Sequence, residues 1–246
     1  MKKISILLTV ILLFTFNSQS FARPLIADLS LRKISIDSGF TGTDILLFGA
    51  RNDAGDVVVV VRGPKRPYIV RKKEKLAGIW VNSKQVTFND VQGFYTVASN
   101  RPLKDLKNSQ LLESLEIGYE NVSLINKNAG NLDVEPFKKA LLDDKKNKKL
   151  YNPTIEEVKF TGETLFRAII NFPENIQRGT YSAEVYLFSD GQLIGMQTTP
   201  LLVYKTGFDA WVFDFAHNSP ALYGLSAILL ALAGGWAAGL IFRKVS

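Results

Sequence analysis

Short runs in which apolar and polar residues alternate make up most of the chain, and this period is typical of β-strands. Leu29–Ile36 alternates with one slip, and Thr43–Ala50 carries four consecutive apolar residues that predict a buried central strand. Val57–Val61 is a run of five valines, whose β-branched side chains favour strands. Further strands are predicted at 68–71, 79–81, 86–97, 165–172, 181–188 and 193–203.

The period changes in the middle of the chain. Pro102–Tyr119 has leucines close to helical spacing, and Glu135–Asp144 places Phe137 and Leu141 on one side of a second helix. The polar run DDKKNKK closes this part. We therefore predict a helical insertion at about 101–150 within a β protein.

One short motif narrows the fold class. The segment Gly179–Ala183, GTYSA, is similar to the corner before the sixth strand of immunoglobulin-like domains, where a tyrosine hydroxyl bonds back to the backbone. Tyr181 would be this tyrosine, and Trp80 is the candidate for a core tryptophan. We predict a mainly β protein built as an immunoglobulin-like β-sandwich, one or two, with another type of β-sandwich as the alternative.

Two apolar segments predict where the chain sits. Residues 1–22 begin with Lys2 and Lys3, continue with a short apolar run, and read as a secretory signal peptide that is removed. Residues 221–242 contain 22 residues without a charge. A helix of that length is about 33 Å long, enough to cross a membrane, so we predict one C-terminal transmembrane helix.

These segments predict the organisation of the whole chain. The exported domain is expected at 23–207, a juxtamembrane linker at 208–220, and a stub at 243–246. Arg243 and Lys244 favour the cytoplasmic side for the stub. The protein is thus predicted to cross a bacterial inner membrane once, with its N-terminal domain in the periplasm and its C-terminus in the cytoplasm.

Composition excludes some classes of function. The net charge of +7 falls to +3, from 26 basic and 23 acidic residues, once Lys2, Lys3, Arg243 and Lys244 are left out. Such a balance does not indicate nucleic-acid binding. The chain has no cysteine, so the exported domain must be stabilised by packing alone and no thiolate metal site is possible.

The densest charge in the sequence follows the valine run. Seven basic residues between positions 62 and 75 face one acidic residue, Glu74, and two prolines keep the segment extended. This pattern indicates a surface for anionic lipid or an acidic partner, or else a solvated strand edge that lysines protect from pairing. The basic residues are Arg62, Lys65, Arg66, Arg71, Lys72, Lys73 and Lys75.

The apolar C-terminal part offers two further candidate surfaces. Small residues every four positions, at Ala227, Ala231, Gly235 and Gly239, indicate a face that packs on another membrane helix, either a membrane-protein partner or a second copy. Equally, Gly and Ala are common in membrane helices. Before the span, aromatic residues indicate an interfacial belt or the end of a last strand; they are Trp211, Phe213, Phe215 and Tyr223.

Signatures of catalysis are missing from the sequence. There is one histidine, His217, and no motif of a serine nucleophile, a zinc peptidase or a nucleotide-binding loop. We therefore expect no enzymatic activity, no cofactor and no metal.

Seven stretches together resemble the putative transmembrane proteins of alphaproteobacteria. They are SGFTGTDILLFGA, DVVVVVRGP, AGIWVN, FYTVASNRPL, LFRAIINFP, RGTYSAEVYLFSDG and LYGLSAILLALAGGWAAGLIFRK, and they cover nearly all of the chain after the signal. The resemblance implies an exported domain on one C-terminal span, without an assigned activity, and a position beside sulfite-exporter-like permeases.

Three hypotheses about function follow. The first is a non-enzymatic periplasmic interaction or accessory module that assists a membrane partner such as a permease. The second is a ligand-binding sensor or a hydrolase with a site near the helical insertion. The third is a structural envelope protein.

Overall fold

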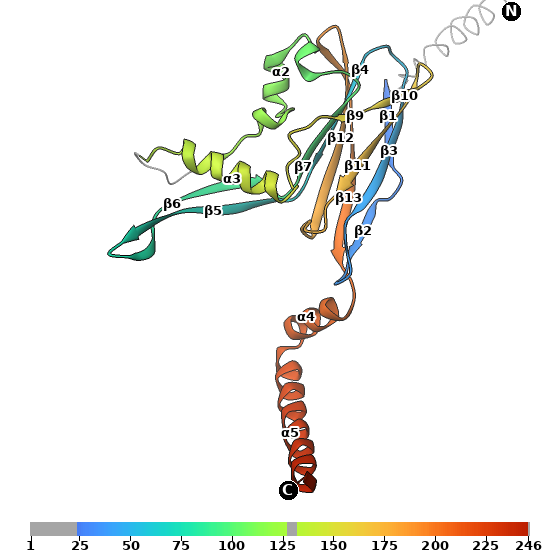
Figure 1. Ribbon diagram of the computed structural model, residues 1–246. Helices are drawn as coiled ribbons and strands as arrows, with labels where there is room; N and C mark the ends of the chain where they lie inside the picture. The colour runs from blue at the N-terminus through green and yellow to red at the C-terminus, as the bar shows by residue number, and fades with distance from the viewer. Residues whose placement is uncertain (1–23, 127–131, 246) are drawn as a thin grey trace, which may run out of the picture.

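The structure, a computed structural model, describes residues 24–126 and 132–245 (Figure 1). A β-sandwich lies at one end, a two-stranded arm projects from it, and two C-terminal helices lead away from it. The mainly β fold that the sequence predicts is confirmed. The predicted signal peptide, 1–22, lies outside the described residues.

One layer of the sandwich is an antiparallel four-stranded sheet in the order β1-β3-β11-β10. Strand β11 alternates strictly between exposed and buried residues because only one of its faces meets the core. The strands are β1 (Leu25–Leu29), β3 (Thr43–Arg51), β10 (Lys159–Thr161) and β11 (Leu165–Phe172).

The second layer is a six-stranded sheet in the order β2-β13-β12-β4-β7-β9. All five valines of β4 are buried, because this central strand faces the other sheet on one side and the helical insertion on the other. The strands are β2 (Lys33–Ile36), β4 (Asp56–Arg62), β7 (Tyr95–Ser99), β9 (Glu156–Glu157), β12 (Gly179–Ser189) and β13 (Gln192–Lys205).

This strand order is compatible with an immunoglobulin-like sandwich. The first sheet matches the A-B-E-D order, and β13, β12 and β4 match G, F and C. Leu29–Ile36 is not the single strand that its alternation predicts. The chain leaves the first sheet after Leu29 and enters the second at Lys33, where β2 pairs in parallel with β13.

The predicted tyrosine corner is present. The hydroxyl of Tyr181, at the start of β12, donates a hydrogen bond of 2.8 Å to the carbonyl oxygen of Gln177, and Ala183 two residues on is buried. The prediction that Trp80 lies in the core is wrong, since this residue is 67% exposed. Strand β4 occupies the position of the strand that carries the core tryptophan in immunoglobulin domains, and valines fill that place here.

The helical insertion covers the outer face of the second sheet and the base of the arm (Figure 1). Four apolar residues of the insertion are part of the main hydrophobic core: Leu106, Leu112, Ile117 and Val122. Its elements are the 3-10 helices η1 (Leu103–Asp105) and η2 (Tyr119–Asn121), the helices α2 (Ser109–Ser114) and α3 (Glu135–Asn147), and strand β8 (Ile125–Asn126).

Replacing Tyr181 by phenylalanine tests the corner. We expect Tyr181→Phe to lower the free energy of unfolding by about 1 kcal/mol, because the Gln177 carbonyl loses its donor while the buried ring remains. Urea unfolding of the full chain in detergent measures this change. Tyr204→Phe, at a position 40% exposed on β13, is the matched control. Equal unfolding curves for the two variants would contradict a stabilising role for the corner.

Candidate functional site: the β5–β6 arm and the C-terminal helices

Strands β5 (Lys65–Leu76) and β6 (Ile79–Gln92) form a long antiparallel hairpin that projects away from the sandwich (Figure 1). Their turn consists of Ala77 and Gly78, which both have positive φ, 49° and 88°. This is the backbone of a two-residue type I′ turn, whose twist matches that of the strands. The sequence predicted separate short strands here, and the structure joins them into one arm.

The base of the arm is supported by a small hydrophobic core of its own. Val86, Phe88 and Val91 of β6 are buried against Phe137 and Leu141 of α3. Strand β8 also pairs with β6 at this end. Packing against helix α3 therefore fixes the direction of the arm.

A buried lysine lies at the same junction. The Nζ of Lys145, on α3, lies 3.8 Å from the ring centroid of Tyr68 on β5, and the hydroxyl of Tyr68 accepts a hydrogen bond from Gln177. Burial lowers the pKa of Lys145, although the neighbouring Tyr68 acts in the opposite direction. These contacts hold α3, the arm and the turn before β12 together.

Beyond this support the arm is exposed on both faces. From Arg71 to Gln85 no residue is buried. Five basic residues and one acidic residue, Glu74, occupy this distal part, and Glu74 pairs with Lys72 at 2.9 Å. The basic residues are Arg71, Lys72, Lys73, Lys75 and Lys84.

The tip of the arm is apolar. Leu76, Ile79 and Trp80 are 70%, 69% and 67% exposed. In the register of the hairpin Leu76 pairs with Ile79, and Lys75 pairs with Trp80. Because successive pairs of a hairpin point to opposite faces, the tip presents apolar side chains on both sides.

The predicted basic cluster is divided by the fold. Arg71, Lys72, Lys73 and Lys75 lie on the distal arm, whereas Lys65 and Arg66 lie at its base. Arg62 does not belong to this surface. Its side chain is 11% exposed and ion-paired with Glu184.

Arg62 instead connects the sandwich to the helical insertion. It donates to the carbonyl oxygen of Leu115 at 2.7 Å, and the Glu184 carboxylate also accepts from the Tyr186 hydroxyl at 2.6 Å. Burial acts to lower the pKa of Arg62, but Glu184 and Tyr186 outweigh it and the pKa is raised. No signal in the sequence points to this role, because Arg62 reads as the first of seven basic residues on an exposed segment.

The base of the arm lies at the end of the sandwich that leads to the C-terminal helices. Arg66 donates a hydrogen bond of 3.2 Å to the carbonyl oxygen of Arg178, and the guanidinium of Arg178 lies 5.0 Å from the ring centroid of Phe213. Phe213 belongs to helix α4 (Phe208–Asn218). These three residues line one cavity of about 960 Å³.

The predicted aromatic belt lies on helices and not on a last strand. Trp211, Phe213 and Phe215 are on α4, where Trp211 stacks on Phe215 with centroids 5.5 Å apart. Tyr223 is on the last helix, and its ring meets that of Phe215 at 5.9 Å. Trp211 and Phe213 are exposed.

Helix α5 (Pro220–Val245) contains the predicted span. Its segment Pro220–Gly239 has a mean hydropathy of 1.7 and is not buried; the ring contact of Tyr223 with Phe215 of α4 lies near its start. It is long and apolar enough to cross a membrane. Gly235 and Gly239 each face open space, so the small-residue face with Ala227 and Ala231 remains free for another helix.

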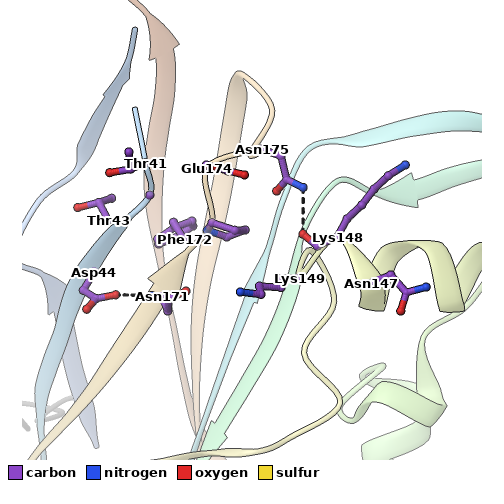
Figure 2. A pocket seen from close by; sticks show the side chains of 12 residues that line it. Thr41, Thr43, Asp44, Asn147, Lys148, Lys149, Asn171, Phe172, Glu174 and Asn175 are labelled. Atoms are coloured by element: carbon purple, nitrogen blue, oxygen red, sulfur yellow. Dashed lines mark hydrogen bonds between the residues drawn. The ribbon is translucent and has the colours of Figure 1, made fainter. Parts of the chain in front are cut away.

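One hollow beside the insertion could hold a small molecule (Figure 2). Its volume is about 720 Å³, and Asp44 and Glu174 are the acids that line it. Asp44 accepts a hydrogen bond of 2.6 Å from Asn171, and the Asn175 amide donates to the Lys148 carbonyl at 3.0 Å. In the part of the chain that the structure describes, no three histidine or acidic residues could hold a metal ion.

Comparison with known proteins identifies a family. No curated protein matches the chain. A chain of the solved structure "Structural basis of T cell specificity and activation by the bacterial superantigen toxic shock syndrome toxin-1" is 6% identical, with 74% of this chain and 99% of that chain covered and a TM-score of 0.26. The family model described as putative transmembrane protein (Alph_Pro_TM) matches residues 24–244, and the chain belongs to this family.

Proposed function

We propose that this protein is a non-enzymatic accessory module of the bacterial envelope, anchored in the inner membrane, that binds a membrane-protein partner. The observation that carries the proposal is helix α5, whose segment Pro220–Gly239 is apolar and unburied, so its surface is open to lipid and to another helix. The arm is a second exposed surface, since its distal half is basic and exposed on both faces. The supported base directs the exposed part away from the sandwich.

The sandwich is proposed to lie in the periplasm. The signal pattern at 1–22 would send the chain across the membrane, and α5 would stop it with Arg243 and Lys244 on the cytoplasmic side. Because the chain has no cysteine, a single introduced cysteine reports this topology without background. Glu163→Cys, in an exposed turn, should react with a membrane-impermeant maleimide added to intact spheroplasts. Labelling only after lysis would contradict the orientation.

The partner is proposed to be a helix of another membrane protein, such as a permease, packed on α5. Ala227, Ala231, Gly235 and Gly239 let two helix backbones approach closely, which is how helices associate in lipid. A second copy of the chain would use the same face.

Photo-crosslinking in native membranes tests the partner. A photoreactive residue in place of Ala231 should form one adduct with a membrane protein, and Gly235→Leu/Gly239→Leu should abolish it because the larger side chains separate the backbones. Ala233→Leu/Ala237→Leu enlarges the opposite face and is the matched control. Recovery of the monomer alone, or an adduct that the glycine replacements leave unchanged, would contradict the proposal.

A hydrolase near the helical insertion has less support. It would need acids that are free to act on a substrate, and in the hollow beside the insertion Asp44 is engaged by Asn171.

A further inference from the structure

We infer that the tip of the β5–β6 arm inserts into the anionic headgroup layer of the same bilayer that holds α5. The protein would then contact its membrane at two points, the C-terminal helix and the arm. The inference rests on the proposed function only in that α5 crosses the membrane, and it needs no protein partner.

The first support is the order of chemical groups along the arm. The last three large side chains before and after the turn, Leu76, Ile79 and Trp80, are apolar and more than half exposed. Lys75 pairs with Trp80, and Lys73, Lys72 and Lys84 follow farther from the turn, with Glu74 as the one acid among them. The layers of a bilayer have the same order of chemical groups, because anionic phosphates lie at its surface and the apolar interior lies beneath them. Lysine side chains can keep their ammonium groups at the phosphates while their methylene groups lie deeper.

The second support is that the tip is apolar on both faces. Leu76 and Ile79 point to one face of the hairpin, and Trp80, which pairs with Lys75, points to the other. A sheet or helix packed against one face of the hairpin would leave the apolar side chains of the other face in water. Lipid would surround both faces of an inserted tip. Tryptophan is also enriched at membrane–water interfaces.

The third support is the position of the arm relative to the anchor. Its base contacts helix α4 through Arg66, Arg178 and Phe213, at the end of the sandwich from which α5 departs (Figure 1). From Arg66 to Leu76 the strand extends about 33 Å, so tilting the sandwich by about 30° moves the tip by about half that length. Thr206 is still hydrogen-bonded to Ile36 of β2, so Gly207 alone joins the sandwich to α4; glycine accepts many backbone conformations, and a tilt at this residue would separate Arg178 from Phe213.

An environment-sensitive fluorophore at the tip tests the inference. The full chain carrying Ile79→Cys, labelled with a nitrobenzoxadiazole dye, is placed singly in nanodiscs of phosphatidylethanolamine with about 30% phosphatidylglycerol. We expect a blue-shifted emission and strong quenching by lipids that carry a doxyl group near the headgroup end of the acyl chain. The same dye at Glu163→Cys, in the turn between β10 and β11, should show water-like emission and no quenching.

Charge reversal tests whether the lysines of the arm, and not exposed lysines elsewhere, attract the tip to the bilayer. Lys72→Glu/Lys73→Glu/Lys75→Glu should abolish the quenching at position 79, and raised salt should weaken it, because screening reduces attraction between exposed charges. Lys104→Glu/Lys139→Glu/Lys146→Glu changes three exposed lysines elsewhere by the same amount and should leave the quenching intact. Both triple variants alter exposed side chains only, so an unchanged melting temperature verifies that each is folded.

Several outcomes would overturn the inference. Water-like emission from position 79 in anionic discs would show that the tip does not enter lipid. Equal quenching in discs of phosphatidylcholine alone would overturn the role of the lysines. If the dye at position 79 shows blue-shifted emission in native membranes but water-like emission in lipid discs, the tip binds an acidic protein partner instead of lipid. In each case the crosslink from α5 to a partner helix is unaffected, so the two proposals fail independently.

Discussion

Arg62→Met is expected to lower the free energy of unfolding by about 3–5 kcal/mol. The arginine and Glu184 are both nearly buried, with side chains 11% and 15% exposed. Removing the guanidinium leaves the Glu184 carboxylate buried without its cation and the Leu115 carbonyl without its donor. An unpaired buried charge is far more costly than the net stabilisation that the pair provides.

A double-mutant cycle separates the pair from its surroundings. Arg62→Met/Glu184→Leu should be destabilised by less than the sum of the two single variants, with a coupling of about 1–3 kcal/mol, because neither charge is then left alone. Full recovery is not expected, since the hydroxyl groups of Ser182 and Tyr186 lose their acceptor.

The matched control is an exposed arginine of the same sandwich. Arg32 pairs with Asp28 at the surface, where its side chain is 64% exposed, and Arg32→Met should change stability by less than about 1 kcal/mol. Urea unfolding of the full chains in detergent, followed by near-ultraviolet circular dichroism, measures both variants. Similar losses for Arg62 and Arg32 would contradict a buried structural role for Arg62.

Phe172→Ala is expected to lower the free energy of unfolding by about 3–5 kcal/mol. Phe172 ends β11 and is 1% exposed. Its ring stacks on Phe94 with centroids 4.9 Å apart and meets Tyr181 edge-on at 5.8 Å. These aromatic side chains bridge the two sheets beside the tyrosine corner, so their contacts cannot be replaced without leaving a cavity.

Phe48→Ala is the control for this cavity. Phe48 lies on the neighbouring strand β3, but its side chain points outward and is 45% exposed. We expect its loss to change stability by less than about 1 kcal/mol, because most of the removed surface already faces water. Phe172→Leu, which fills most of the volume, should lie between the two. A cost for Phe172→Ala no larger than that for Phe48→Ala would contradict the packing described here.

The basic segment after the valine run illustrates how far sequence reasoning reaches. From Lys65 onward its charges and prolines correctly indicate an extended segment outside the core, whereas Arg62 is nearly buried. They do not reveal that this segment pairs with 79–92 into one arm, because the pairing depends on a turn whose first residue, Ala77, has a positive φ. Alanine is not a typical signal for that conformation. The packing of α3 against the base of the arm is likewise a contact between segments that are distant in the sequence.

Local pattern alone determined the β character, the helical insertion, the tyrosine corner and the long apolar C-terminal segment. Each of these depends on residues close together in the sequence, whose spacing is set by strand or helix geometry. Only the tertiary structure decided that Arg62 is buried while Lys72 is exposed, and that Trp80 lies at a tip and not in the core. Burial depends on what packs opposite a side chain, and the residues that do so here lie up to 122 positions away, as Glu184 does from Arg62.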